Sequence, residues 1–454
     1  MTNISLDDAA FLLGESAGKP AHVIALQLFK PPSDAGDDFT TQMYADLLAM
    51  DDIKSVFRKR PKRKLTSPST LEWVDEGLDA DYHVRHAALP RPARVRELLE
   101  TVSLQHGVML DRRRPLWESH LYEGLQDGRF ATTFKTHHAL ADGISLAGHV
   151  LGGLSPDPSS RSCTPPWVTP LTGAETPGRS TTRLPAEHRS RDLLAPAKLG
   201  YATVRTLRDM SNDVHARLPF EAPRSIFNVG IGGARRFAGD QWEHARLKAI
   251  ANATHCSVND VVLAVCGGAL RAFLEELDAL PDRPLVAMVP VSLRRPDAVF
   301  ESGEGNAFGS ILCDLGTDQG DALARLDSIH HQMTTGKKRL SELSPREVLA
   351  VSRLIMGGAV LSALGLGGTP RQPFNLIISN VPASHHPLYY NGAEMTDIYP
   401  ISMISEGQAL NITVTRYADK ITFGIVGDRK AVPHLQRMLI HLENAIADLE
   451  KTTT

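Results

Sequence analysis

Residues 130–143 read Phe130-Ala-Thr-Thr-Phe-Lys-Thr-His137-His138-Ala-Leu-Ala-Asp142-Gly143. The first seven residues alternate large apolar side chains with smaller or polar ones, a pattern that predicts a half-buried β-strand. The apolar segment from Ile144 to Leu154 predicts a helix, with Asp142 in the N-cap position. Two histidines therefore lie at a strand end, where an imidazole can project into a cleft and accept a proton near neutral pH.

The length of the chain, 454 residues, exceeds the size at which a single core keeps growing. Two domains of about 150–220 residues are therefore expected. The side chains are 42% hydrophobic and 22% charged, as in ordinary globular proteins. The formal net charge of -3 argues against a general nucleic-acid-binding protein, which needs a basic surplus.

The four cysteines, Cys163, Cys256, Cys266 and Cys313, are scattered without a CxxC pair. Neither a zinc ribbon nor a disulfide framework is indicated, which fits a reducing compartment. The N-terminal segment lacks the basic and apolar regions of a signal peptide, and no run of about 18 uncharged apolar residues follows. We therefore expect a cytoplasmic protein that is soluble or peripheral on a membrane or lipid inclusion.

The chain carries a complete HHxxxDG motif at His137–Gly143, which acyl-CoA-dependent acyltransferases share with peptide-synthetase condensation domains. Five further stretches occur in the order and rough spacing of one family: Pro115-Leu-Trp-Glu118, Ser257-Val-Asn259-Asp260, Val289-Pro-Val-Ser-Leu-Arg294, Ser379-Asn-Val-Pro382 and Leu410-Asn-Ile-Thr413. From Leu6 to Leu449 the chain therefore resembles the wax ester synthase/diacylglycerol acyltransferase family. It departs from that family at Ala383, where glycine usually follows Ser-Asn-Val-Pro.

The resemblance implies an α/β fold, an α+β sandwich of two chloramphenicol-acetyltransferase-like domains with the active site and a tunnel at their interface. We place the N-terminal domain, which carries HHxxxDG, at residues 1–155 and the C-terminal acyltransferase-like domain at residues 223–454. Residues 156–222 are expected to form a linker. Pro, Ser, Thr and Arg dominate most of that segment without a sustained hydrophobic period.

Acyl transfer from a thioester to an alcohol needs a base, donors for the oxyanion and correct positioning. His138 is the histidine four positions before Asp142, and we assign it as the general base that deprotonates the hydroxyl group. The departing thiolate has a pKa of roughly 8–9 and needs little acid help, so a direct transfer without a covalent acyl-enzyme is predicted. Asn259 begins a helix that Ser257 already caps, which makes its amide a candidate oxyanion donor.

We expect four residues to shape the site without reacting: His137, Asp142, Gly143 and Arg294. The aspartate resembles a structural residue of HHxxxDG enzymes that pairs with an arginine, and either Arg294 or the pair Arg58 and Arg60 could supply the partner. Glycine after it would let the backbone leave the strand tightly. His137 is favoured as a neighbour of the base, because one base suffices.

The resemblance also implies a substrate channel, for which we single out Glu15, Pro115, Leu116, Trp117, Gly357, Gly358 and Ala359. A simpler alternative exists for Trp117, since tryptophan is highly buried on average and is more often part of a core. The apolar segment 347–366, which holds the last three residues, also reads as a buried helix. Small side chains on that helix could instead admit a long acyl chain.

The segment from Lys54 to Lys64 carries seven basic side chains and no acidic one. Such a run often faces water as a solvated loop. It could also form an electrostatic site for the phosphates of a thioester carrier or for anionic lipid head groups.

Two other patterns are weaker. The segment Gly14-Glu-Ser16-Ala-Gly18 matches GxSxG, but a nucleophile elbow needs a strand before the serine and a helix after it, and the predicted order here is reversed. His137, His138 and Asp142 lack the HExxH spacing of a zinc site, so no metal is predicted.

The resemblance thus implies an O-acyltransferase that moves a long-chain acyl group from acyl-CoA to a fatty alcohol or diacylglycerol, giving wax ester or triacylglycerol. Acyl-CoA acts as a co-substrate, and no cofactor or nucleic-acid partner is expected. The alternatives are another HHxxxDG enzyme of the condensation or polyketide-associated type, a serine esterase that uses Ser16, and a non-catalytic lipid-inclusion protein.

Overall fold

The structure is a computed structural model that describes residues 2–64, 67–168, 220–292, 308–344 and 372–453, together with residues 347, 348, 350–352, 355 and 357. These residues form two compact units, and each unit combines stretches that lie far apart in the sequence. Unit 1 holds the described residues within 2–168, 226–249 and 379–440, and unit 2 holds those within 220–225, 250–378 and 441–453. The division into domains at residues 155 and 222 follows the order of the chain and stays a prediction.

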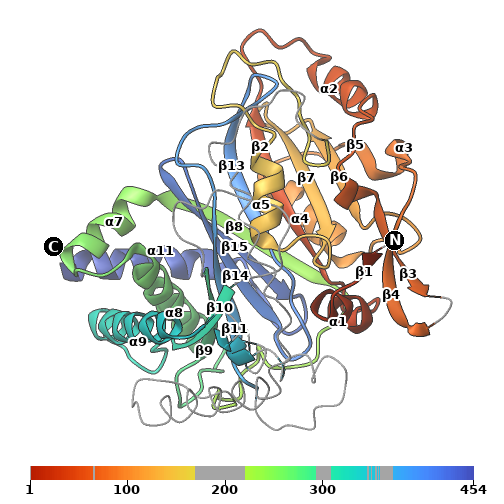
Figure 1. The fold of residues 1–454 in the computed structure, drawn as a ribbon. Helices are drawn as coiled ribbons and strands as arrows, with labels where there is room; N and C mark the ends of the chain where they lie inside the picture. The colour runs from red at the N-terminus through yellow and green to blue at the C-terminus, as the bar shows by residue number, and fades with distance from the viewer. Residues whose placement is uncertain are drawn as a thin grey trace. The chain divides into compact units, whose positions relative to one another are not determined.

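Unit 1 is built on a six-stranded mixed sheet with the order β12-β13-β2-β7-β6-β5 (Figure 1). The strands span Tyr389–Tyr390 (β12), Ala393–Ile401 (β13), His22–Lys30 (β2), Phe130–His137 (β7), Trp117–Glu123 (β6) and Val84–Ala88 (β5). Neighbouring strands are antiparallel except β5 and β6, which are parallel. The predicted strand before the two histidines is confirmed, and it pairs along both edges inside the sheet.

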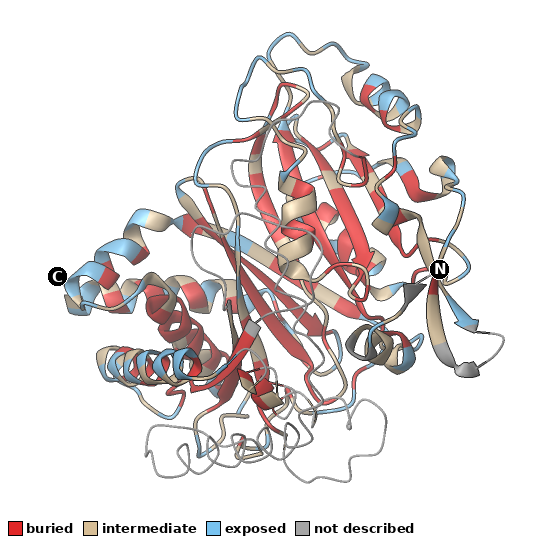
Figure 2. Cartoon of the chain, in the orientation of Figure 1, coloured by how far each residue is buried: buried red, intermediate tan, exposed pale blue. Residues whose placement is uncertain are grey.

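Strand β7 is buried on both faces, whereas its alternating pattern predicted one buried face (Figure 2). The second face is covered by helix α4 (Val95–Gly107). Thr133 Oγ1 donates to Gln105 Oε1 (3.2 Å), and the ammonium group of Lys135 donates to the carbonyl oxygens of Gln105 and Val108. A cation at the end of a helix interacts favourably with its unpaired carbonyl groups, so the polar side chains of β7 are satisfied where they are buried.

The face of β7 that points away from α4 carries the main apolar core of unit 1. Phe130 and Phe134 project into it, and the Phe134 ring centroid lies 5.3 Å from that of Phe57 and 5.6 Å from that of Trp117. Trp117 also stacks on Trp167 with centroids 5.0 Å apart. Full burial of one large apolar side chain is worth about 1.5–3 kcal/mol, so this aromatic cluster fixes β6 against β7.

Unit 1 also contains a three-stranded sheet, β1-β4-β3, and an antiparallel ladder of β14, β15 and β8. These strands span Thr2–Asn3 (β1), Lys59–Lys64 (β3), Ser67–Asp75 (β4), Arg235–Glu243 (β8), Leu410–Tyr417 (β14) and Lys420–Asp428 (β15). The remaining helices are Leu6–Gly14 (α1), Phe39–Leu48 (α2), Ala80–His83 (α3), Gly143–Leu151 (α5) and the 3-10 helix Ser55–Arg58 (η1). Most of the basic segment 54–64 therefore lies in η1 and β3 rather than in a loop.

In unit 2, β10 (Phe308–Asp314) is antiparallel to β9 (Val286–Ser292), and β9 pairs in parallel with the start of β11 (Leu376–Pro382). The helices of this unit are α8 (Val258–Glu276) and α9 (Ala322–Glu342). A Cβ added at Gly336 of α9 would lie 2.9 Å from the Ile311 side chain of β10. Glycine at this position therefore allows the helix to pack closely on the sheet.

Two further helices are α7 (His244–Ala253) and α11 (Arg437–Thr453). No single helix in the described ranges has the length and hydropathy to span a membrane, and α7 and α8 pass such a test only together, as a bent pair. The predicted helix at 347–366 lies mostly outside the described residues, although those of its residues that are described are helical.

Candidate active site

The two histidines of the HHxxxDG motif lie where β7 leaves the sheet. The backbone N–H of His137 donates to the carbonyl oxygen of Leu116 (3.0 Å), and that of His138 donates to the carbonyl oxygen of Ala21 (2.9 Å). Leu116 directly precedes β6 and Ala21 directly precedes β2, the two neighbours of β7. The end of β7 is therefore fixed from both sides, which gives the His138 side chain a defined position.

The imidazole of His138 is partly buried and stacks on the ring of Phe11, with centroids 4.3 Å apart. Its Nδ1 atom is buried and has no hydrogen-bond partner within the described part of the chain. Burial lowers the pKa of His138 to about 4, although the nearby carboxylate of Asp142 acts to raise it. The ring is therefore neutral at pH 7 and keeps one nitrogen lone pair that can accept a proton.

Asp142 is the N-cap of α5, as predicted. Its side chain accepts a hydrogen bond from the backbone N–H of Ser145 (2.7 Å), which satisfies one of the unpaired donors at the helix start. The carboxylate thus fixes the turn that follows the two histidines, and it remains close enough to His138 to influence the charge of that ring.

Neither Arg58 on η1 nor Arg60 on β3 is the arginine that was expected to pair with Asp142. Arg58 forms an ion pair with Asp75 (3.5 Å), and Arg60 forms one with Glu76 (2.5 Å). The other candidate, Arg294, lies outside the described residues. The arginine partner therefore stays a prediction that now rests on Arg294.

Gly143 begins α5 with a φ outside the left-handed region. A Cβ at this position would lie 3.6 Å from Cγ2 of Val381, which is an ordinary van der Waals distance. Contrary to expectation, the structure does not require glycine at this turn.

The Val381 contact joins two of the motifs that were found separately in the sequence. Val381 belongs to Ser379-Asn-Val-Pro382, and its carbonyl oxygen accepts a hydrogen bond from Thr415 Oγ1 (2.7 Å). The hydroxyl groups of Ser379 and Thr413 also lie within hydrogen-bond distance (3.1 Å). The stretches 379–382 and 410–413 are therefore bonded to each other, and the first packs against HHxxxDG.

His137 is fully buried, and its neighbours fix its tautomer. Its Nδ1 accepts a hydrogen bond from the backbone N–H of Ala139 (3.1 Å), so a neutral ring carries its proton on Nε2. That Nε2 lies 3.6 Å from Oε2 of Glu15. These contacts favour the interpretation of His137 as a neighbour of the base rather than a second base.

Glu15 forms a buried ion pair beside the two histidines, although it was expected to face a substrate channel. Its Oε2 accepts hydrogen bonds from Nε (3.1 Å) and Nη2 (2.8 Å) of Arg112. Its Oε1 accepts one from the backbone N–H of Ala21 (3.0 Å). Burial alone would raise the pKa of Glu15, but His137, the Ala21 N–H and Arg112 together lower it to about 2. Because the carbonyl group of Ala21 holds the backbone of His138, this carboxylate supports both histidines.

The stretch from Pro115 to Trp117 is divided between core and surface. Leu116 and Trp117 are 0% exposed, and Trp117 Nε1 donates to the carbonyl oxygen of Phe57 (2.8 Å). The alternative that Trp117 belongs to the core is therefore confirmed. Pro115 does line a pocket, together with charged residues from two neighbouring segments.

Asn259 lies on α8 in unit 2 and is partly buried. Ser257 accepts a hydrogen bond from the N–H of Asp260 (3.2 Å), and the carboxylate of Asp260 accepts one from the N–H of Ser257 (3.0 Å). These two bonds form a capping box, and Ser257 caps α8 as predicted.

Of the three small residues that were predicted to line the channel, only Gly357 is described, in a helical and partly buried position. Gly358 and Ala359 lie outside the described residues.

Ser16 follows α1 and precedes β2, so the order is helix, serine, strand. The GxSxG segment therefore lacks the strand-serine-helix context of a nucleophile elbow. Within the ranges that the structure covers, no group of three or more His, Cys, Asp or Glu side chains is arranged to hold a metal ion.

Sequence reasoning missed Phe11, which stacks on His138, and Arg112, which pairs with Glu15. Arg112 stands in a run of three arginines, and its neighbours Arg113 and Arg114 pair with nearby surface carboxylates instead. The local pattern offers no signal that separates the three. Only the fold shows that the first of them turns inward.

Two family models match the chain. The wax ester synthase/diacylglycerol acyltransferase catalytic domain matches residues 4–262, and the WS/DGAT C-terminal domain matches residues 304–450. A putative diacylglycerol O-acyltransferase of Mycobacterium tuberculosis is 46% identical over 446 residues, which is 98% of each chain. The O-acyltransferase WSD of Acinetobacter baylyi is 38% identical over 451 residues, which is 97% of this chain and 95% of the relative.

The fold also has solved counterparts. The wax ester synthase/diacylglycerol acyltransferase from Marinobacter aquaeolei VT8 superposes with a TM-score of 0.81 at 37% identity, and the match covers 100% of both chains. The first condensation domain of the CDA synthetase superposes with a TM-score of 0.60 at 16% identity, over 100% of this chain and 96% of that one, which shows a shared fold. The predicted α/β fold of the chloramphenicol acetyltransferase type is confirmed. With two family models and a relative of 46% identity spanning nearly its whole length, the chain belongs to the wax ester synthase/diacylglycerol acyltransferase family.

Proposed function

We propose that the chain transfers a long-chain acyl group from acyl-CoA to the hydroxyl group of a fatty alcohol or a diacylglycerol. The products are a wax ester or triacylglycerol and free coenzyme A. The observation that carries this proposal is the neutral imidazole of His138, which stands at a strand end fixed from both sides. The names of the relatives, diacylglycerol O-acyltransferase and wax ester synthase, support the choice of substrates.

In this reaction His138 removes the proton of the hydroxyl group as its oxygen attacks the thioester carbonyl carbon. A C–O bond forms, and the carbonyl electrons move to oxygen to give a tetrahedral oxyanion. Collapse of the oxyanion breaks the C–S bond, and the thiolate of coenzyme A leaves and takes the proton from His138. Base catalysis of this kind is worth about 10²–10⁴-fold.

The oxyanion needs a hydrogen-bond donor, and the side-chain amide of Asn259 is the proposed one. Loss of such a donor costs roughly 10²–10³ in turnover. Support comes from the chemistry of the primary amide, which donates hydrogen bonds, at a partly buried position in the first turn of α8.

Two alternatives from other classes are less well supported. A serine esterase would need Ser16 in a strand-to-helix turn, and the structure places it between a helix and a strand. A condensation-type enzyme shares the fold, but the condensation domain compared above is only 16% identical, so it supports the fold and not the substrate. Labelling of Ser16 by a fluorophosphonate with loss of activity would favour the esterase.

We also propose that the protein meets its lipid acceptor at the surface of a membrane or lipid inclusion in the cytoplasm, because long-chain alcohols and diacylglycerols leave water for such phases. Sedimentation with phosphatidylcholine vesicles that contain diolein tests this. Part of the protein should be recovered with the vesicles. Recovery in the supernatant at every lipid concentration would contradict the proposal.

The proposed reaction is tested by incubating the purified protein with palmitoyl-CoA and either hexadecanol or diolein, in parallel. Release of free thiol should match, mole for mole, the formation of palmityl palmitate or of a triacylglycerol identified by mass spectrometry. Thiol release with palmitic acid as the product would instead indicate a thioesterase. The absence of product with both acceptors would overturn the proposal.

A further inference from the structure

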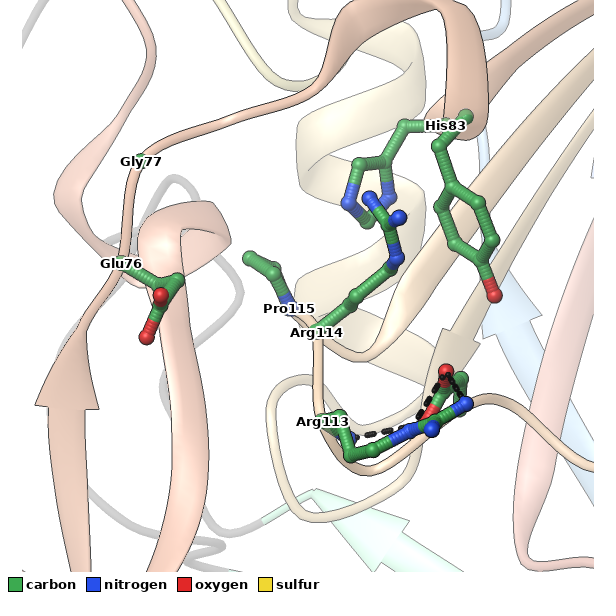
Figure 3. Close-up of a pocket in the computed structure, with 8 residues that line it drawn as sticks. Glu76, Gly77, His83, Arg113, Arg114 and Pro115 are labelled. Atoms are coloured by element: carbon green, nitrogen blue, oxygen red, sulfur yellow. Dashed lines mark hydrogen bonds and ion pairs between the residues drawn. The ribbon is translucent and has the colours of Figure 1, made fainter.

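Unit 1 contains a polar pocket that the reaction described above does not use (Figure 3). Its volume is about 480 Å³, which lies in the range of small-molecule sites. The lining residues are Glu76, Gly77, Tyr82, His83, Asp111, Arg113, Arg114 and Pro115. Figure 3 shows Glu76 and Gly77 on one side and His83, Arg113, Arg114 and Pro115 on the other.

One wall of the pocket is a buried histidine with an unsatisfied nitrogen. His83 is 0% exposed, and its Nδ1 donates to the carbonyl oxygen of Trp117 (2.7 Å). Burial lowers the pKa of His83, so the ring is neutral and its Nε2 is a hydrogen-bond acceptor. That Nε2 is buried and finds no partner among the described residues. An unpaired buried acceptor is unfavourable, so a ligand that offers an N–H or O–H group here gains affinity.

The same wall presents two arginines whose present partners are easily replaced. Arg113 pairs with Asp111 (2.9 Å) while 89% of its side chain is exposed, and Arg114 pairs with Asp79 (2.7 Å). Exposed ion pairs of this kind contribute little to stability. A phosphate group accepts bidentate, charge-assisted hydrogen bonds from guanidinium groups and competes well with such surface carboxylates.

Arg114 is also held in place by an aromatic ring. Its Cζ atom lies 3.9 Å from the centroid of Tyr82, which is a cation–π contact. This contact limits the rotamers of the long side chain, so less entropy is lost when the guanidinium group binds an anion.

The opposite side of the pocket does not repel an anion. Glu76 is neutralised by Arg60 of β3 (2.5 Å). β3 belongs to the basic segment 54–64, for which the sequence left a phosphate or lipid-head-group site open. That segment therefore borders the pocket through Arg60.

We propose that this pocket binds the phosphate-bearing head group of the acyl donor. Arg113 and Arg114 donate to phosphate oxygens, and His83 accepts a hydrogen bond from an N–H or O–H group of the same ligand. Coenzyme A offers both, because it carries phosphates together with amide and hydroxyl groups. The inference rests on the proposed function, since it assigns a place to one part of the donor that this function requires.

The experiment compares two acyl donors in the double variant Arg113→Gln/Arg114→Gln. Palmitoyl-CoA carries the phosphates, and palmitoyl-N-acetylcysteamine is the same thioester without them. The double variant should raise KM for palmitoyl-CoA roughly tenfold or more, with kcat nearly unchanged, and leave kcat/KM for the phosphate-free donor as in the wild type. An unchanged KM for palmitoyl-CoA, or an equal loss with both donors, would overturn the inference.

Two further variants sharpen the result. Arg96→Gln is the matched control, because Arg96 is 74% exposed on α4 and pairs with Glu100 (3.3 Å), and it should alter neither donor's kinetics. His83→Asn retains an amide donor for the Trp117 carbonyl group but removes the Nε2 acceptor. It should raise KM for palmitoyl-CoA several-fold with kcat nearly unchanged, in a variant that circular dichroism shows to be folded.

Direct binding separates this inference from the proposed function and from a lipid ligand. Calorimetry with adenosine 3′,5′-bisphosphate should show binding to the wild type and a roughly tenfold loss in the double variant, even if no acyl transfer occurs. Acyl transfer by the wild type, together with equal nucleotide binding by the wild type and the double variant, would refute the pocket assignment and leave the proposed function intact. Loss of binding to phosphatidylglycerol vesicles, with an unchanged KM for palmitoyl-CoA, would assign the site to lipid instead.

Discussion

At the scale of single residues, burial decides the protonation state of the imidazole at position 138. It lowers the pKa of His138 to about 4, and the opposing influence of the Asp142 carboxylate does not restore the ordinary value of 6.5. The base is therefore ready to accept a proton throughout the neutral range, whereas an ordinary histidine would be partly protonated below pH 7.

The pH dependence of kcat/KM tests this protonation state. Because the folded-state pKa is depressed, the neutral form persists as the pH falls through 6.5 and is lost only near pH 4. We expect kcat/KM to change little between pH 7 and pH 5.5, where an unperturbed histidine would lose about tenfold. Circular dichroism at each pH confirms that the protein stays folded. An acid limb centred near pH 6.5 would contradict the burial of this ring.

The carboxylate at position 15 should act by positioning. Glu15→Gln keeps the size of the side chain and removes its charge, which leaves Arg112 without its buried partner. Loss of a buried ion-pair partner costs about 3–5 kcal/mol. Arg112 is 40% exposed, so we expect the free energy of unfolding in urea to fall by less, about 2 kcal/mol. The kcat should fall while KM for acyl-CoA stays constant.

The matched control is Glu100→Gln, which makes the same chemical change at a carboxylate that is 48% exposed and pairs with Arg96. Its unfolding free energy should change by less than about 0.5 kcal/mol. Equal effects of the two variants would show that Glu15 is not part of a buried pair.

At the scale of elements, the start of α5 separates two roles of one aspartate. Asp142→Asn keeps a good N-cap but removes the charge near His138, whereas Asp142→Ala removes both. The alanine variant should lose about 1 kcal/mol of unfolding free energy, and the asparagine variant much less. If asparagine abolishes turnover while stability is kept, the negative charge itself is required and the structural role is insufficient.

The local sequence pattern predicted the presence of strands and helix caps better than it predicted which side chains are buried. The alternation from Phe130 to Thr136 indicated a strand, and a strand is present, but Thr133 and Lys135 are buried because α4 covers their face. Ser257 caps α8, as the sequence indicated, and Ser5 caps α1. Side-chain spacing shows the period of an element, whereas coverage by a distant helix depends on tertiary packing.

At the scale of the whole molecule, strand pairing between distant segments could not be read from the sequence. β13 pairs with β2, and Ile401 lies opposite Ile24, although β13 follows more than 350 residues after β2. The residues of either strand do not specify which other strand it pairs with. The same holds for the site. The motif predicted His138, but only the fold brings Arg112 and Val381 close to the HHxxxDG segment.

Buried histidines make the stability of unit 1 sensitive to acid. Burial lowers the pKa of His106 to about 3 and that of His22 well below its usual value. The unfolded chain therefore binds more protons than the folded one below pH 6.5, so stability is lost as the pH falls from 6.5 towards 4. Two such groups together give a slope of about 2.7 kcal/mol per pH unit.

Urea unfolding at pH 7.5, 6.5 and 5.5 measures this slope. The free energy of unfolding should be nearly constant between the first two values and clearly lower at the third. Replacing His106 by Gln should reduce the drop. A free energy that rises on acidification would contradict the buried, neutral state of these rings.

The central claim is that the His138 imidazole is the base for acyl transfer, and the most direct measurement is the turnover of His138→Ala with palmitoyl-CoA and its preferred acceptor. The variant should bind acyl-CoA and melt within a few degrees of the wild type, with thiol release and ester formation reduced by about 10²–10⁴-fold. Ester formation within a few-fold of the wild-type rate, by a folded variant, would contradict it.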